Sequence, residues 1–343
     1  MKALVLKKYG EFMYEEVPDP EIGDSDVLIE VKACGICGSD VHGMDGSTGR
    51  RQPPIIMGHE ASGVIAEVGS SVAGWNKGDR VTFDSTVYCG ECWFCRRGEI
   101  NLCDNRRVLG VSCEDYRRHG AFADYVAVPQ RILYRLPDGV SFEQAAIVEP
   151  LSVATHAVER TPILSNDTAV VVGVGMIGLL VVQVLRAAGC GTIVGVDIEP
   201  EKLELARKLG ADVALDATDC DVAKEVLELT AGRGADIAVE AVGVSAAIKT
   251  AVGCLRKGAT LTLVGNLSPE VELPLQSVVT REITLNGSCA SRGEFPMCLD
   301  LIAKGQVNVD ALVSAVAPLS KGASWFDRLY KKEKGLMKVI LKP

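Results

Sequence analysis

The sequence places four cysteines at close intervals in one short segment, CGECWFCRRGEINLC. Cys89, Cys92, Cys95 and Cys103 follow the pattern C-x2-C-x2-C-x7-C. This spacing lets four thiolates meet at one tetrahedral zinc ion, and four protein ligands leave no open position for water or substrate. The segment therefore predicts a structural zinc site, in a lobe that covers about residues 88–104.

Two other chemistries use similar cysteine patterns. A bacterial ferredoxin run continues as C-x3-C-P after its first three cysteines, whereas here the fourth cysteine lies eight positions further on and precedes Asp104. A redox C-x-x-C motif usually stands as a single pair at the start of a helix. Structural zinc is favoured over both an iron–sulfur cluster and a redox pair.

A second set of candidate metal ligands lies upstream. Cys37 belongs to the stretch CGICGSDVHG, and His59 and Glu60 belong to GHE. These residues are too far apart for a local zinc knuckle, so the fold has to gather them. Catalytic zinc sites often take three protein ligands from separate elements and keep a fourth position open. We therefore expect a catalytic zinc site at these residues.

The stretch TAVVVGVGMIG, residues 168–178, combines an apolar strand with a G-x-G-x-x-G turn and an apolar helix. Such a turn makes room for a pyrophosphate at the helix N-terminus. Asp197 ends the next apolar strand, where its carboxylate would bind the adenosine ribose and repel a 2′-phosphate, which favours NAD over NADP. The turn residues expected at the cofactor are Gly173, Val174, Gly175, Met176, Ile177 and Gly178.

Other cofactor contacts are expected where the later strands end, because ligands of such sheets lie at the carboxyl ends of the strands. Lys202 follows Asp197 by five residues and is either a neighbour of the adenosine or a solvated helix lysine. The remaining candidates are Val242, Val264, Gly265 and Cys289.

The combined motifs resemble the zinc-containing medium-chain alcohol dehydrogenases. The match includes GHE with Gly63 and Gly69 behind it, GDRV at 78–81, the cysteine lobe and the glycine turn. The resemblance implies an α/β chain with two domains. One is a GroES-like, partly open β-barrel catalytic domain over 1–150 and 290–343, and the other is a Rossmann domain, a doubly wound parallel sheet that binds NAD, over 151–289.

The resemblance also implies roles for individual residues. Cys37 and His59 match zinc ligands of the family, and Glu149 in EPLSV matches the third ligand of its polyol and threonine branch. Glu60 competes with Glu149 for the metal, either directly or through its water. Ser39 and His42 match a relay that carries the alcohol proton to solvent, and Cys34 matches a residue that is not a ligand.

The implied reaction is the oxidation of a secondary alcohol of a polyol, sugar alcohol or sugar acid to the ketone, with two zinc ions per chain and NAD. Sorbitol-type enzymes carry an aromatic residue directly after D-V-H and an arginine in G-x-F-R, whereas this chain has Gly43 and the run 287–290, GSCA. These departures disfavour sorbitol itself. L-Threonine 3-dehydrogenase or butanediol dehydrogenase activity, and a zinc- and NAD-binding protein without turnover, are the alternatives.

Composition limits the partners. The formal net charge of −9 over 343 residues disfavours nucleic acids and anionic membranes, which would repel the chain. The apolar run from Thr168 to Leu185 carries the glycine turn and is expected to be a strand and helix, not a membrane span. The N-terminus lacks the features of a secretory signal. We expect a cytoplasmic enzyme, and the resemblance implies a homodimer or homotetramer.

Overall fold

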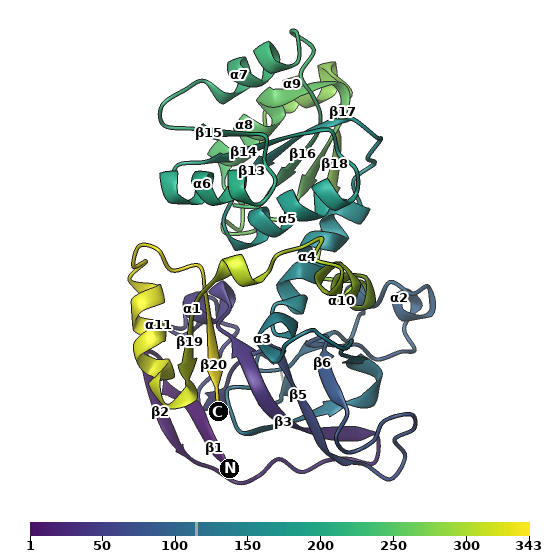
Figure 1. The fold of residues 1–343 in the computed structure, drawn as a ribbon, viewed down its shortest axis with the longest axis vertical. Helices are drawn as coiled ribbons and strands as arrows, with labels where there is room; N and C mark the ends of the chain where they lie inside the picture. The colour runs from purple at the N-terminus through teal and green to yellow at the C-terminus, as the bar shows by residue number, and fades with distance from the viewer. Residues whose placement is uncertain (114–115) are drawn as a thin grey trace. The chain divides into compact units, whose positions relative to one another are not determined.

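The computed structural model describes residues 1–113 and 116–343. These residues form two compact units (Figure 1). The first unit contains Met1–Glu149, Phe295–Lys304 and Val309–Pro343. The second contains Pro150–Glu294 and Gly305–Asn308.

The second unit is built on a six-stranded parallel sheet. Its strand order, β15-β14-β13-β16-β17-β18, is that of a doubly wound dinucleotide-binding sheet, because the first strand in the chain lies at the centre and the order reverses beside it. The strands are β13 (Thr168–Val172), β14 (Thr192–Asp197), β15 (Val213–Asp216), β16 (Ala235–Glu240), β17 (Leu255–Leu263) and β18 (Thr284–Gly287).

Helices cover both faces of this sheet, which explains why its central strands are apolar without alternation. Figure 1 shows α5 (Met176–Ala187) and α6 (Pro200–Lys208) on one face, with α7 (Val222–Leu229) and α8 (Ser245–Cys254) on the other. Every residue of β13 and of β16 is buried between them. The remaining α-helices near this part of the sequence are α4 (Val148–Glu159), α9 (Leu275–Thr280) and α10 (Phe295–Ala303).

The apolar run from Thr168 to Leu185 is divided between β13 and the 12-residue helix α5. Among residues 1–113 and 116–343, no helix combines the length and the hydropathy that a membrane crossing requires.

The first unit is mostly β structure. Its seven-stranded sheet has the order β12-β6-β5-β3-β20-β19, with β11 also paired to β3, and a second sheet has the order β2-β1-β4. The longest neighbours, β3 (Asp26–Gly35) and β5 (Glu60–Val68), are antiparallel. The other strands are β1 (Lys2–Lys8), β2 (Glu11–Glu16), β4 (Ile55–Ile56), β6 (Arg80–Phe83), β7 (Thr86–Val87), β8 (Arg107–Val108), β9 (Ser112–Cys113), β10 (Tyr116–Arg117), β11 (Tyr125–Pro129), β12 (Leu133–Arg135), β19 (Val313–Pro318) and β20 (Lys338–Lys342).

Short helices complete the first unit. The α-helices are α1 (Gly38–Gly43), α2 (Trp93–Arg96), α3 (Phe142–Ala145) and α11 (Gly322–Tyr330), and the 3₁₀ turns are η1 (Ile100–Leu102), η2 (Gln130–Ile132), η3 (Asp310–Leu312) and η4 (Leu319–Lys321).

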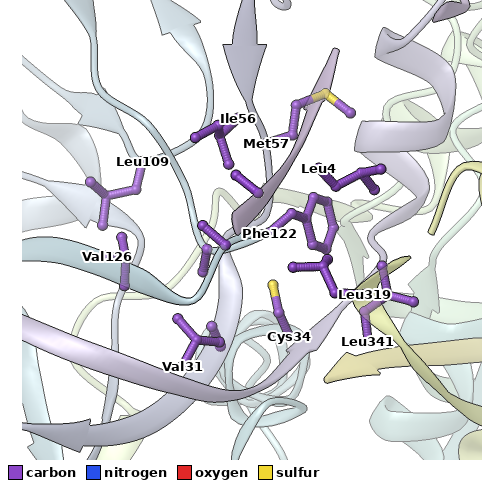
Figure 2. Packing of buried hydrophobic residues seen from close by; sticks show 14 of the residues in the cluster. Leu4, Val31, Cys34, Ile56, Met57, Leu109, Phe122, Val126, Leu319 and Leu341 are labelled. Atoms are coloured by element: carbon purple, nitrogen blue, oxygen red, sulfur yellow. The ribbon is translucent and has the colours of Figure 1, made fainter. Parts of the chain in front are cut away.

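The core of the first unit contains Cys34, the cysteine that the sequence placed next to the candidate ligands. Figure 2 shows its side chain among those of Phe122 and Leu341. A Cβ on Gly58 would lie 2.9 Å from the Cys34 sulfur, so the glycine lets this thiol pack closely. Burial raises the pKa of the Cys34 thiol. Cys34 is therefore a packed core residue.

We predict that Phe122→Ala lowers the free energy of unfolding by about 3–5 kcal/mol, because it leaves a cavity in this core. Phe122 is 0% exposed and packs edge to face on Phe326, with ring centroids 5.6 Å apart. Urea denaturation measures the change. Met13→Ala, at a side chain that is 46% exposed, is the control, and equal effects of the two changes would contradict this description of the core.

Candidate metal and dinucleotide sites

Strand pairing in the first unit brings Cys37, His59 and Glu60 together. β3 ends at Gly35, which is paired with Glu60 at the start of β5, so the residues just beyond these strand ends lie side by side. Cys37 is the N-cap of α1, and His59 immediately precedes β5. The candidate ligand atoms of the three side chains all lie within 4.8 Å of one another.

Glu60 is held by a buried ion pair. The Lys338 ammonium donates to Glu60 Oε2 at 2.6 Å and to the Ile36 carbonyl at 3.1 Å. Burial lowers the pKa of Lys338, but the Glu60 carboxylate and the Cys37 sulfur raise it by a larger amount. The net pKa is therefore raised, and the lysine is charged. Gly35 has no Cβ to collide with Glu60 Oε2. The other oxygen, Glu60 Oε1, is buried and has no hydrogen-bond partner in the described chain.

His59 is influenced by two neighbouring side chains, Asp40 and Cys37. Asp40 Oδ1 is 3.4 Å from His59 Nδ1 and 2.8 Å from a guanidinium nitrogen of Arg51. Burial alone would raise the pKa of Asp40, but His59 and Arg51 hold it well below its usual range. Burial lowers the pKa of His59, and Asp40 and Cys37 raise it by more, so the surroundings of the imidazole favour positive charge.

Glu149, the alternative third ligand, lies in the first turn of α4 and is partly buried. Burial raises its pKa to about 7, with Glu60 and Asp84 adding to the shift and His59 opposing it. Glu149 is thus an electrostatic neighbour of Glu60 and His59. Within the described residues, the cluster whose ligand atoms lie within 4.8 Å of one another consists of Cys37, His59 and Glu60, and Glu149 is not part of it.

The donor set of this cluster fits a zinc ion. One thiol, one imidazole and one carboxylate are the atom types that zinc accepts, and three protein ligands from separate elements are typical of a catalytic site. The buried Glu60 Oε1, which lacks a hydrogen-bond partner in the described residues, supplies the observation that a cation would explain. The site therefore has the composition of an open zinc site.

The two relay candidates lie on α1, next to the cluster. Ser39 is exposed, and its hydroxyl donates to Cys37 Sγ at 3.3 Å and accepts from Arg51 at 3.3 Å. His42 is also exposed, and its carbonyl accepts a hydrogen bond from Ser47. The structure thus places Ser39 directly at the cluster and His42 one turn further along the helix.

The cysteine lobe forms a separate cluster. Cys89, Cys92, Cys95 and Cys103 each offer a sulfur within 4.8 Å of the others. Backbone N–H groups point at these sulfurs: Cys92 N donates to Cys89 Sγ at 3.4 Å, and Cys89 N donates to Cys103 Sγ at 3.3 Å. Hydrogen bonds from the Glu91 and Cys92 backbone lower the pKa of Cys89 to about 6. The donor set and the backbone hydrogen bonds fit a closed four-thiolate zinc site.

The glycine turn of the second unit is so tight that the backbone requires glycine at two of its positions. Gly173 has φ +88°, a conformation that favours glycine, and Gly175 is the N-cap of α5. A Cβ on Gly178 would collide with the Gly173 carbonyl oxygen, so only glycine permits the helix to lie this close to the turn. Val174 is buried, whereas Met176 and Ile177 are partly exposed at the start of α5.

Asp197 at the end of β14 supports the same turn. Its Oδ2 accepts from Val174 N at 2.9 Å, and its Oδ1 accepts from Ile198 N at 2.8 Å. The carboxylate is thus fixed beside the first glycines. Lys202 pairs with Glu199 at 2.7 Å, as a surface helix lysine does.

A cavity of about 230 Å³ lies at the carboxyl ends of β16 and β17. Four of the candidates border it: Ile177 from the glycine turn, and Val242, Val264 and Gly265 from the later loops. Cys289 follows β18 and is exposed, and it is not among the residues that line this cavity. The remaining lining residues are Ala241, Asn266 and Leu267.

Three charged residues near the metal cluster escaped the sequence analysis. Asp40 lies inside the quoted GSD stretch, on a helix that also exposes Ser39 and His42, and no pattern in the sequence marked it as buried. Arg51 lies in a polar segment, RRQ, that carries no motif. Lys338 follows Glu60 by 278 residues, and only the pairing of β20 with β3 brings it to the cluster.

A doubly wound parallel sheet and a strand-built unit with two clusters of candidate zinc ligands are features of the zinc-dependent dehydrogenases. Residues 23–138 match the family model described as an alcohol dehydrogenase GroES-like domain, and residues 176–304 match the zinc-binding dehydrogenase model. The chain belongs to the zinc-binding dehydrogenase family of the alcohol dehydrogenase type.

Relatives of known name agree with this assignment. The chain is 36% identical to sorbitol dehydrogenase of Bacillus subtilis, covering 100% of this chain and 97% of the relative. It is 35% identical to D-arabitol-phosphate dehydrogenase of Enterococcus avium, covering 94% and 91%. A solved structure from Sinorhizobium meliloti, described as a zinc-binding dehydrogenase bound to NADP, covers 100% of this chain and 99% of its own at a TM-score of 0.92 and 31% identity.

The family resemblance, the GroES-like and Rossmann fold class and the enzymatic class expected from the sequence are thereby confirmed.

We predict that Cys92→Ser removes one zinc per chain and lowers the thermal midpoint by roughly 5–10 °C, because a structural zinc contributes directly to folding. Metal analysis and thermal unfolding measure the two effects. Cys220→Ser is the matched control, because a serine hydroxyl can keep the hydrogen bond that this thiol donates to the Asp216 carbonyl. A Cys92→Ser protein with normal stability that has lost only turnover would contradict the structural role.

Proposed function

We propose that this chain uses NAD to oxidise a secondary alcohol of a polyol, sugar alcohol or sugar acid to the ketone. The observation that carries the proposal is the convergence of Cys37, His59 and Glu60 in a chain that also holds a complete glycine turn for a dinucleotide. Dehydrogenation needs both parts: the cluster would hold a metal ion that polarises the alcohol oxygen, and the glycine turn would hold a nicotinamide cofactor that supplies the chemistry of hydride transfer.

The residues of the metal cluster have distinct roles in this proposal. Cys37, His59 and Glu60 hold the zinc, which when bound supplies Lewis acidity to the alcohol oxygen. Glu60 is favoured over Glu149 as the direct ligand because a Glu60 carboxylate oxygen belongs to the cluster. Lys338 holds Glu60 Oε2, whereas Oε1 has no hydrogen-bond partner in the described residues. Glu149 remains a nearby acid with a raised pKa.

Proton removal is assigned to α1. Ser39 lies at the cluster, where its Oγ would accept the alcohol proton while its own O–H proton passes to the His42 imidazole. His42 would then release a proton to solvent, since an imidazole exchanges protons near neutral pH. Both side chains are exposed, which a path to water requires.

The substrate class follows from the departures at Gly43 and at 287–290 together with the names of the relatives. Both named relatives act on polyols or their phosphates, according to their names. A polyol-type alcohol is thus favoured, and sorbitol is less favoured than other members of that class. L-Threonine 3-dehydrogenase or butanediol dehydrogenase activity is the second candidate.

The chain is also proposed to form a homo-oligomer with two zinc ions per protomer. The support is a set of exposed apolar side chains on the second unit, such as Leu275 at 62% and Val279 at 65% exposed. Patches of this kind often mark contacts between protein chains. Light scattering of the purified protein measures the number of protomers.

The test of the function is NADH formation by the purified protein with a panel of polyols, sugar alcohols, their phosphates, sugar acids, threonine and diols. We expect turnover with at least one polyol-type alcohol and two zinc ions per chain. Inactivity on the whole panel, in protein that binds zinc and NAD, would favour a binding protein without turnover.

Cys37→Ala and His59→Ala are predicted to reduce alcohol oxidation to the background rate while NAD binding stays unchanged. The reason is that each variant removes a metal ligand in the first unit and leaves the glycine turn of the second unit intact. Steady-state kinetics and cofactor titration by fluorescence measure the two properties. Cys34→Ala is the comparison, because Cys34 packs in the core and should retain turnover; an active Cys37→Ala protein without metal would refute the site.

Asp197→Asn is predicted to raise the ratio of NADP to NAD utilisation about 10-fold. The amide keeps an acceptor for Val174 N but removes the negative charge that opposes a 2′-phosphate, a change of roughly 1.4 kcal/mol. The ratio of kcat/KM for the two cofactors measures it. Asp219→Asn, at an exposed acid of the same unit, should leave the ratio unchanged; an unchanged ratio for Asp197→Asn would contradict the NAD assignment.

A further inference from the structure

We propose that Arg51 is a positioning residue for alcohol oxidation, which fixes the hydroxyl of Ser39 and the carboxylate of Asp40, and that Gly43 is the matching residue that makes room for it. This inference rests on the proposed function. Arg51 lies in a segment without a motif, eight residues before His59, and its side chain is almost completely buried, at 3% exposed.

The Arg51 guanidinium contacts two parts of the site at once. Its Nη2 donates to Asp40 Oδ1 at 2.8 Å and to Ser39 Oγ at 3.3 Å, and its Nε donates to the same Asp40 oxygen at 3.3 Å. That oxygen lies 3.4 Å from His59 Nδ1. The planar guanidinium of Arg51 therefore connects the Ser39 hydroxyl to the Asp40 carboxylate, which lies next to His59.

The donor-only chemistry of arginine determines how Ser39 is oriented. A guanidinium has no acceptor atom, so Ser39 can only accept from Arg51 and has to direct its own O–H elsewhere. In the structure that O–H is directed to Cys37 Sγ, at 3.3 Å. Arg51 thus keeps the hydroxyl facing the metal cluster.

Stability alone is a weak explanation for this contact. A buried Arg–Asp pair recovers little net free energy after its desolvation cost, and an apolar pair of similar volume is often as stable. Asp40 is 0% exposed, so both partners bear that cost. The pair is better explained by the position it imposes on Ser39 and on the His59 ring.

Gly43 explains how the arginine reaches this place. A Cβ at position 43 would lie 2.6 Å from Arg51 Cγ and 3.7 Å from Arg51 Cβ, so the stem of the arginine occupies the space beside the glycine. The contact involves the base of the side chain, which cannot swing away without moving the guanidinium. Any larger residue at position 43 therefore displaces Arg51 from Ser39 and Asp40.

The kinetic test is a double-mutant cycle between Arg51→Lys and Ser39→Ala. Lysine keeps a positive charge for Asp40, so the protein should fold, but it lacks the fork that also reaches Ser39. We expect Arg51→Lys to lower kcat roughly 10-fold, an effect equivalent to one charged hydrogen bond, with zinc content and NAD affinity unchanged. In the Ser39→Ala background, Arg51→Lys should have no further effect. Arg50→Lys, at the exposed neighbouring arginine, is the control and should leave kcat unchanged.

A second cycle tests the placement without any turnover. Gly43→Ala should lower the urea midpoint of the wild-type protein, and it should have a much smaller effect in an Arg51→Ala background, where the stem is gone. Additive effects in this cycle, or additive effects of Arg51→Lys and Ser39→Ala on kcat, would overturn the proposal. A wild-type protein inactive on the whole alcohol panel would refute the proposed function instead, and the urea cycle would still report whether Gly43 and Arg51 are matched.

Discussion

The pairing of β3 with β5 is the constraint on which the metal cluster depends. Because Gly35 is paired with Glu60, the chain beyond the end of β3 lies beside the chain that enters β5. Cys37 and His59 are then brought together by backbone hydrogen bonds and not by a flexible loop. Candidate ligands next to paired strand ends keep their positions more precisely than residues in the middle of a long loop. Gly35 completes the arrangement by leaving space for the Glu60 carboxylate.

Around this cluster, buried charges occur in compensated sets, as the low polarity of the interior demands. Lys338 neutralises Glu60 and Arg51 neutralises Asp40, at 2.6 and 2.8 Å. Each pair leaves one carboxylate oxygen, Glu60 Oε1 and Asp40 Oδ2, buried without a hydrogen-bond partner in the described chain. Lys338 and Arg51 therefore hold the two carboxylates in place through one oxygen each. The second oxygen of Glu60 is left available as a candidate metal ligand.

Patterns that are local in sequence allowed much of this molecule to be predicted. The glycine turn and the cysteine lobe each lie within about fifteen residues, and their residue types carry the geometry themselves. The surroundings of the catalytic cluster could not be predicted in the same way. Lys338 reaches Glu60 only because β20 pairs with β3. Arg51 reaches its position only because Gly43 has no side chain to occupy the same space. Such contacts depend on tertiary register, which no short motif encodes.

The protonation of the cluster links metal binding to acidity. His59 and Glu149 both have raised pKa values, the first because of Asp40 and Cys37, which outweigh its burial, and the second because of its burial and the neighbouring carboxylates. A zinc ion binds the neutral imidazole and the ionised carboxylate, so its arrival releases protons and its affinity rises with pH. The negative charge of Asp40, which raises the pKa of His59, also attracts a cation. At His59, the electrostatic environment that favours a bound proton is therefore also one that favours a bound cation.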